Sequence, residues 1–400
     1  MNSVIKMKIQ TIEKARRYLF AYHGLLNEHI FEGKSGITDF VKLVGCVQFD
    51  PIDICGRNAD LTLQSRVRHY KKSMLEELLY QDRSLMDYFD KNLSIISTDD
   101  WPLMSRRREQ FRKESRSSEV ADKHEQMILD YLEENEYACS KDIDLKERAD
   151  WYWSASSSAR VVLETLYFRG DLVIHHKKGT IKYYSKQTHL FNDQLMDRSF
   201  SDDEHDDLFL LRRIKAVGLL WDKPSDALLG IMDLKSARRK AAFKRLLESN
   251  KIISVNIDGI KDSMFVPSEH IVLFENPPEI RQVRTEFLAP LDNLMWDRKL
   301  ISAIFGFDYK WEIYEPEHKR KYGYYVIPVI QDDAFVGRIE VINQKKTKTL
   351  LIKRFWQEKL INSKSLEECI ERFALFNQAK HIEYSPDWFI VSLNGPSESL

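Results

Sequence analysis

The chain has little glycine and no long uncharged apolar segment. Glycine accounts for 14 of the 400 residues, about half its average share, and neither a GxxxxGKS/T loop nor a GxGxxG loop occurs. Nucleotide hydrolysis and nicotinamide chemistry are therefore not indicated. No stretch approaches the roughly 18 uncharged apolar residues of a membrane helix, and the N-terminus lacks the apolar core of an export signal. We expect a protein without membrane association.

Cysteines and metal-binding patterns are equally sparse. The four cysteines are irregularly spaced, which fits a reduced cytoplasmic protein better than a disulfide framework. There is no HExxH or CxxC pattern and no GxSxG elbow. The nearest metal signal is the pair His175–His176, which we interpret as solvent-exposed, because adjacent strand residues point to opposite faces. We predict no metal and no cofactor.

Acidic and basic residues almost balance. Lysine and arginine total 61, aspartate and glutamate total 62, and the formal net charge is −1. This balance excludes an overall cationic protein but not a cationic face, because opposite patches cancel in the sum. At roughly 150 residues per domain, the length predicts two to four domains.

The N-terminal part of the chain is predicted to be mainly helical. Thr11 is placed to cap a first helix, a second helix is expected to begin at Thr38, and residues 75–116 have a mostly helical pattern. A short extended segment, residues 46–52, follows the second helix.

An internal repeat occupies the middle of the chain. Residues 122–186 predict three helices, the second short and near 140–148, and then two strands around a tight turn. The same order recurs further along, with Asp258-Gly259 at the hairpin turn. This order is that of a winged helix. The pattern predicts two winged helices in tandem, joined by an acidic surface linker at residues 201–207.

The sequence becomes rich in strand-forming residues after about residue 276. Three such runs separated by polar turns predict an antiparallel meander or small barrel, before a helix near 365–379 and a last strand. The predicted fold class is α+β, with tandem winged-helix domains followed by a small C-terminal β-barrel-like domain. We place an N-terminal winged-helix-like domain at residues 1–118, a second winged helix at 119–200, a third at 201–275 and the β-rich domain at 276–400.

Basic side chains cluster on the third helix and the wing, the elements that a winged helix usually lays against DNA. From this pattern we select as DNA-binding candidates Lys177, Lys178, Arg238, Arg239 and Lys240. Such clusters neutralise phosphates. Any one of them is equally well explained as a solvated face, and winged helices also mediate protein contacts.

Gln48 and Asp50 form the candidate catalytic pair. Residues i and i+2 of an extended segment share a face, and Pro51 keeps Asp50 out of the helical region. An amide beside a carboxylate can hold one water, which the amide orients while the carboxylate accepts a proton or stabilises positive charge. By itself a Q-x-D pattern is weak, and a turn cap before the proline is the plain structural interpretation of Asp50.

Three segments resemble the winged-helix DNA glycosylases typified by AlkZ and YcaQ. They are EKARRYLFAYHGL, VGCVQFDPIDICGRNADLTLQSR and, most strongly, residues 287–340, which begin FLAPLDNLMWDR. Together with the tandem repeat between them, the resemblance covers most of the chain. The last residues match least.

The resemblance implies three winged helices and a small β-barrel arranged as a concave DNA-binding surface. Members of this family remove alkylated bases, including N7-alkylguanine, and some unhook interstrand crosslinks. Their catalytic motif is Q-apolar-Q or Q-apolar-D, and Gln48 with Asp50 matches the second, YcaQ-like branch.

The same segments supply the remaining DNA-binding candidates. Arg57, Ser65 and Arg66 lie in a polar, basic stretch suited to a DNA-facing surface. Trp296 and Arg298 belong to a stretch whose mixture of proline, acids, arginine and tryptophan is unusual for a plain core, so we expect them near the concave surface. Alternatively, Trp296 packs inside while Arg298 pairs with its neighbouring aspartate.

Two positions depart from the family pattern. Where the family often has R-A-H-D, this chain has arginine, asparagine, Ala59 and aspartate, and a second family histidine is replaced by Lys91. Both changes bear on the substrate range more than on the reaction type.

These features predict a monofunctional DNA glycosylase. Its predicted partner is double-stranded DNA that carries alkylated or crosslinked purines. The reaction is hydrolysis of the N-glycosidic bond of N7-alkylated purines. We expect a monomer in the cytoplasm, associated with the nucleoid. Two alternatives stay open, a non-enzymatic winged-helix transcription regulator and a protein-interaction scaffold, neither of which has a use for the Gln48–Asp50 pair.

Overall fold

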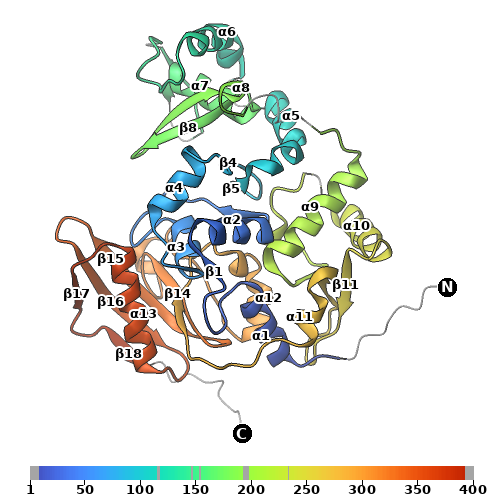
Figure 1. Ribbon diagram of the computed structural model, residues 1–400, viewed down its shortest axis with the longest axis vertical. Coiled ribbons are helices and arrows are strands. Elements are labelled where there is room, and N and C mark those ends of the chain that lie inside the picture. The colour runs from blue at the N-terminus through green and yellow to red at the C-terminus, as the bar shows by residue number, and fades with distance from the viewer. Residues whose placement is uncertain are drawn as a thin grey trace. The chain divides into compact units, whose positions relative to one another are not determined.

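The computed structural model describes residues 9–114, 118–145, 147–152, 155–191, 198–232 and 234–391 (Figure 1). The chain divides into two compact units. The main unit comprises Met1–Met74, Lys91–Ile95 and Asp202–Leu400, and the inserted unit comprises Leu75–Asp90 and Ile96–Ser201. The mixed α+β class is confirmed. The predicted four-domain boundaries stay a prediction.

The first part of the main unit alternates helices with short strands. They are α1 (Ile12–Tyr22), β1 (Phe31–Glu32), α2 (Gly33–Val44), β2 (Cys46–Gln48), α3 (Asn58–Gln64) and β3 (Val67–Arg68). Thr11 caps α1, as predicted, by accepting a hydrogen bond of 3.3 Å from the backbone of Lys14. Helix α2 begins at Gly33 and not at Thr38, because the Thr38 hydroxyl bonds the Ser35 carbonyl inside the helix instead of capping its start.

The second part of the main unit begins with helices and a small sheet. Its elements are α9 (Asp202–Val217), β10 (Leu220–Trp221), η3 (Asp226–Leu228), α10 (Ser236–Glu248), β11 (Ile252–Val255), β12 (Met264–Pro267), η4 (Ser268–His270) and α11 (Ile271–Glu275). The strands are ordered β10-β12-β11, and Gly259 in the hairpin turn has a φ of +75°. The winged-helix assignment stays a prediction.

The predicted acidic linker at residues 201–207 is instead the start of α9. Its carboxylates pair with arginines of α10: Asp206 binds Arg238 and Asp207 binds Arg245. The run therefore serves helix packing through these pairs, while Asp202, Asp203 and Glu204 lie in the first turn, where acids favour the helix dipole.

A mixed sheet forms the C-terminal part of the main unit (Figure 1). Its elements are β13 (Thr285–Phe287), η5 (Asn293–Met295), α12 (Arg298–Phe305), η6 (Glu317–Lys319), β14 (Val326–Gln331), β15 (Ala334–Gln344), β16 (Thr349–Gln357), α13 (Ser363–Phe376), β17 (His381–Tyr384) and β18 (Phe389–Val391). Strands β13 to β16 are antiparallel neighbours, and β17 and β18 both pair with β16 in parallel. Ile370 and Phe373 of α13 join the sheet's apolar core. Barrel closure stays a prediction.

The inserted unit contains its own helices and hairpin. Its elements include β4 (Leu85–Phe89), η1 (Thr98–Met104), α5 (Ser105–Glu114), α6 (Ser118–Glu134), β6 (Arg148–Ala149), β7 (Ser156–Ser157), α7 (Ser158–Arg169), β8 (Leu172–Lys178), β9 (Ile181–Lys186) and α8 (Gln187–Phe191). Helix α4 (Lys72–Tyr80) and strand β5 (Leu93–Ser97) each have residues in both units.

The helical predictions within residues 75–148 were correct at residues 75–80 and 98–114 and wrong in two places. Residues 85–89 and 93–97 are strands whose side chains are mostly buried on both faces, so their apolar runs carried no strand alternation. Residues 140–145 form turns rather than a short helix. Helix α7 ends as predicted at Gly170, which has a φ of +83°.

The His175–His176 pair also differs from its prediction. A β-bulge between Ile174 and His176 disturbs the alternation of the strand. The two imidazoles consequently lie together, with their Nδ1 atoms 2.8 Å apart, and both rings are half-buried.

A fully buried ion pair connects the N-terminal and C-terminal parts of the main unit. A terminal guanidinium nitrogen of Arg66, which follows α3, lies 2.7 Å from Oδ1 of Asp292, and neither side chain is exposed. Arg66 also donates to the Thr62 carbonyl, while Asp292 accepts from Leu294 N and so caps η5. The pair fixes the segment before α12 against α3.

We predict that Arg66→Met lowers the free energy of unfolding of the main unit by about 3–5 kcal/mol, because Asp292 is left as a buried charge without its cation. Urea denaturation followed by tryptophan fluorescence measures the loss. Arg68→Met, two residues along and exposed, is the matched control and is expected to change stability by less than about 0.5 kcal/mol. Equal losses in the two variants would contradict the assignment.

Candidate active site

The Gln48–Asp50 segment leaves strand β2 and turns at Pro51. Gln48 is 6% exposed and Asp50 is half-buried. The Asp50 carboxylate accepts a hydrogen bond of 2.9 Å from the backbone of Ile52, which closes a local turn. The turn-capping interpretation and the catalytic interpretation of Asp50 are therefore compatible, since only one carboxylate oxygen is used by the turn.

Burial acts on the Asp50 carboxyl group. Desolvation raises its pKa above the ordinary value, and the hydrogen bond from Ile52 offsets part of that rise. Burial is the main cause of the raised pKa of the Tyr325 phenol, and the charge of Asp50 makes a smaller contribution. A carboxylate that is poorly solvated is a stronger base and a stronger partner for a developing cation.

Lys91 is the partner of Gln48. Its ammonium donates a hydrogen bond of 3.1 Å to the Gln48 side-chain carbonyl, and Lys91 is only 6% exposed. The same nitrogen lies 4.9 Å from the ring centre of Trp296. Burial, followed by the nearby charge of Arg213, lowers the pKa of Lys91 to about 8. A buried lysine is rare and marks a candidate functional position.

Asparagines attach this segment to the stretch before α12. Asn58 donates to the Gln48 main-chain carbonyl at 2.8 Å and accepts from Leu291 N at 3.0 Å. Asn293 donates to the Cys46 carbonyl at 2.9 Å. Both side chains are buried, so the backbone on each side of Gln48 is held by amide groups from separate parts of the sequence.

The family assignment rests on two comparisons. A family model described as the AlkZ-like DNA glycosylases matches residues 41–376, which include the whole of this site. The chain belongs to this family. The solved structure of the DNA glycosylase AlkZ from Streptomyces sahachiroi is similar with a TM-score of 0.64 at 15% identity, over 96% of this chain and 100% of that one. At this identity the likeness shows the fold.

A DNA glycosylase role, a place in DNA repair and DNA as the partner follow from the AlkZ-like family. Within the described ranges, no cluster of three or more His, Cys, Asp or Glu side chains is arranged for a metal ion. No helix in that part of the chain is long and apolar enough to cross a membrane.

Several predicted DNA-binding side chains are not on the surface of this glycosylase. Ser65 and Arg66 are completely buried, and Trp296 is 3% exposed. Arg66 is taken up by Asp292, and the Trp296 indole donates to the Leu291 carbonyl at 3.0 Å. We correct the expectation that these three face DNA directly. For Trp296, the alternative of packing inside is what the structure shows.

The other candidates of the main unit are more accessible. Arg57 precedes α3 and is half-buried. Arg298 is also half-buried, and its guanidinium lies 5.5 Å from the ring centre of Tyr309 rather than in a described pair with the adjacent aspartate. Lys240 on α10 is exposed. Their contacts with DNA stay predictions.

Arginines of α10 are largely committed to internal pairs. Arg238 binds the Asp206 carboxylate through two hydrogen bonds of 2.7 and 2.8 Å. Arg239 is 6% exposed and lies 2.5 Å from Asp222. The placement of Arg239 on an open DNA-binding face was therefore wrong, because its guanidinium compensates a neighbouring acid.

The wing candidates lie in the inserted unit. Lys177 is half-buried and pairs with Asp87 at 2.7 Å. Lys178 is exposed, with its ammonium 5.1 Å from the ring centre of Tyr183. Of the two, Lys178 is the more exposed, and its contact with DNA stays a prediction.

The sequence indicated Gln48 and Asp50 but missed Lys91 and Asn58 as site residues. Lys91 was noted only as the replacement of a family histidine, although a lysine just before the buried strand Leu93–Ser97 was a usable signal. The long-range hydrogen bond between Asn58 and Leu291 could not be predicted, because the local sequence around Asn58 does not indicate which distant backbone amide it contacts.

We predict that Lys240→Ala weakens binding to undamaged duplex DNA and lowers the slope of log K against log salt by about 0.9, the value of one lost phosphate contact. Arg239→Ala is expected to reduce thermal stability instead, with an unchanged slope, since its side chain is buried against Asp222. Fluorescence anisotropy at several salt concentrations checks both. An unchanged slope in Lys240→Ala would show that this face of α10 does not meet DNA.

Proposed function

We propose that this chain is a monofunctional DNA glycosylase that hydrolyses the N-glycosidic bond of N7-alkylated purines and unhooks interstrand crosslinks formed at that atom. The observation that carries the proposal is the Gln48–Asp50 pair, held at the end of β2 in a member of a DNA glycosylase family. A monomeric state and a cytoplasmic, nucleoid-associated location remain part of the proposal.

The leaving group sets the chemistry that the site must provide. Alkylation at N7 makes the purine cationic, so the glycosidic bond is already weakened and little acid catalysis is required. The sugar becomes oxocarbenium-like as that bond breaks. Asp50 stabilises this cation and accepts a proton from the attacking water, and its raised pKa supports the second role.

Lys91 gives Gln48 a defined orientation. A protonated amine has only donors, so the amide oxygen of Gln48 must face it. The Gln48 amide nitrogen, which has no hydrogen bond to any described residue, is then directed the other way and can hold the oxygen of the attacking water. Lys91 is thus a positioning residue, and Gln48 the group that touches the water.

Lys91 is also an amine with a lowered pKa, which favours a second chemistry, attack on the sugar with strand cleavage through an imine. Borohydride reduction during turnover separates the two. A monofunctional enzyme leaves no covalent protein–DNA complex, whereas a Lys91-dependent trapped complex would overturn the monofunctional part of the proposal while preserving base removal.

We predict that Asp50→Ala reduces release of N7-methylguanine from duplex DNA by about 10²–10³-fold, or roughly 3–4 kcal/mol of transition-state stabilisation. DNA affinity should hold, because phosphates do not approach this half-buried acid closely. Asp53→Ala, in the same turn and paired with Lys345, is the matched control with near wild-type rates. Base release by Asp50→Ala at the wild-type rate, after correction for spontaneous depurination, would reject the catalytic assignment. DNA binding by the wild-type protein without any base release would favour the transcription regulator.

We predict that Lys91→Met lowers kcat about tenfold, or about 1.4 kcal/mol, with an unchanged KM, because Gln48 is no longer oriented. The wild-type rate should fall as pH rises through about 8, the pKa of Lys91, since the charged donor is lost. It should also fall at acid pH, once Asp50 is protonated. In the pH–rate profile of Lys91→Met, the fall at acid pH (the acid limb) should remain and the fall above about pH 8 (the alkaline limb) should disappear. An alkaline limb that persists would contradict the role of Lys91.

A further inference from the structure

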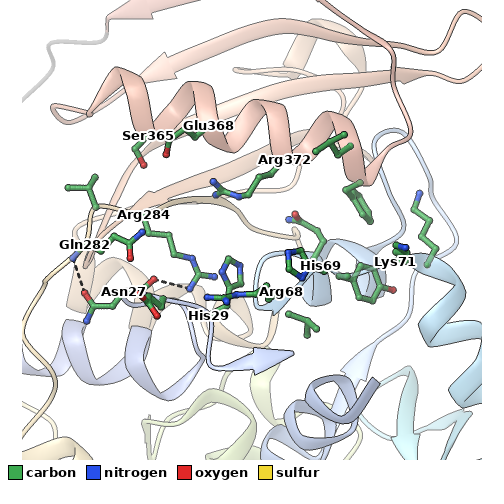
Figure 2. A pocket seen from close by; sticks show the side chains of 18 of the residues that line it. Asn27, His29, Arg68, His69, Lys71, Gln282, Arg284, Ser365, Glu368 and Arg372 are labelled. Carbon is green, nitrogen blue, oxygen red and sulfur yellow. Dashed lines mark hydrogen bonds between the residues drawn. The ribbon is translucent and has the colours of Figure 1, made fainter. Parts of the chain in front are cut away.

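A cavity of about 770 Å³ lies in the main unit, and neither Gln48 nor Asp50 lines it (Figure 2). Four segments line it: residues 27–29 after α1, residues 64–72 around β3, residues 282–284 before β13, and the inner side of α13. The volume lies within the range of about 300–1,000 Å³ that is usual for small-molecule sites. None of the catalytic candidates contributes to its wall.

The wall of this cavity is strongly basic. It carries five lysines and arginines, two histidines and two glutamates. In Figure 2 the side chains of Arg68, Arg284, Arg372 and His29 converge, one from each of the four segments. The buried Glu286 is paired with Arg284 at 2.9 Å and with Arg372 at 3.1 Å. One carboxylate therefore balances two guanidiniums, and Arg68 adds a third.

Some basic side chains of the wall bond to other parts of the protein, and others do not. Arg284 is 6% exposed, and its guanidinium donates hydrogen bonds to Glu286 and to the carbonyls of Gly24, Asn27 and Ser65. The side chains of Arg68 and Lys71, by contrast, make no hydrogen bond or ion pair with any residue that the structure describes. These two side chains are exposed and line the cavity, so their N–H groups are available to a ligand.

The pKa of His29 is lowered inside the cavity. It lies 3.6 Å from Glu286, which by itself would favour the imidazolium. Burial, and then the charges of Arg284, Arg372, Arg68 and His69, nevertheless lower the pKa of His29 to about 3. The imidazole is thus neutral at physiological pH, first because it is desolvated and second because cations surround it.

The turn that presents the unengaged cations has an unusual backbone. His69 has a φ of +57°, a left-handed conformation that residues with a side chain rarely adopt. Such conformations persist where the surrounding structure enforces them and are often found at binding sites. The turn places Arg68 and Lys71 on the same cavity.

We propose that this cavity binds a small phosphorylated ligand of nucleotide size, with its phosphate held by Arg68 and Lys71 beside Arg372. Arginine matches a phosphate with two parallel hydrogen bonds, and lysine adds a point charge. Val67, Val283 and Phe376 provide apolar wall for the organic part of the ligand. The negative charge of the phosphate offsets the excess of positive charge on the wall. This binding is separate from base excision, and it does not depend on the proposed function.

Two sources of that phosphate are distinguished by the choice of probe. Isothermal titration calorimetry uses inorganic pyrophosphate and adenosine 5′-monophosphate as free ligands. A short single strand with and without a 5′-phosphate represents the end of a DNA chain. Saturable binding of the free ligands assigns a small molecule, and binding of only the 5′-phosphorylated strand assigns a DNA end. Both outcomes support a phosphate site provided that they depend on Arg68 and Lys71.

The decisive variant is Arg68→Gln with Lys71→Gln, in which neither lost side chain has a structural bond to break. We expect the affinity of the ligand to fall at least tenfold, and the His29 ring signal of histidine-labelled protein to stop responding to ligand. Lys319→Gln, an exposed lysine of η6 outside the cavity, controls for general charge and should bind like wild type. No saturable binding of any probe to wild type, or equal affinity in the double variant, would overturn the proposal.

Discussion

The buried pair between Arg66 and Asp292 is the constraint on which the rest of the site depends. Each charge would be costly alone in the interior, so the pair forces the end of α3 and the start of η5 to stay in contact. That contact sets the distance across which Asn58 reaches the Leu291 amide. Asn58 in turn holds the main chain of Gln48. The orientation of a catalytic candidate is thus decided by residues more than 200 positions further along the chain.

The surroundings of Gln48 show how a polar site is made rigid inside an apolar environment. Lys91 has a polar acceptor in the Gln48 amide and the π-face of Trp296 beneath it, which together replace part of its lost hydration. Trp296 is fixed by its own bond to Leu291. A histidine, which the wider family often has at this position, would be shorter and able to lose its proton near neutral pH. The lysine provides a longer donor whose pKa, lowered to about 8 by burial, still leaves it charged at neutral pH.

Local sequence rules predicted those parts of the fold that depend on local chemistry. The Thr11 cap, the end of α7 at Gly170 and the turn at Gly259 all follow from short-range geometry. The Q-x-D pair was found because two spaced polar residues before a proline stand out in an apolar run. The burial of Arg66 and Trp296 was not predictable in this way, because it depends on partners that lie far away in the sequence. The strands at 85–89 and 93–97 were missed because burial on both faces removes their alternation.

The positions of the acids in the fold decide which basic side chains of this near-neutral chain stay unpaired at the surface. The acids at the start of α9 pair with arginines of α10, so charges that looked like a free basic helix in the sequence are matched internally. Lysines such as Lys240 are left on the exposed side of the same helix. Arginines, with their planar forks, suit the buried and semi-buried pairs, whereas lysines keep their hydration and remain available to phosphate. A chain with a net charge of −1 can therefore still present cationic surface, because its acids and basic residues are separated by depth rather than by position in the sequence.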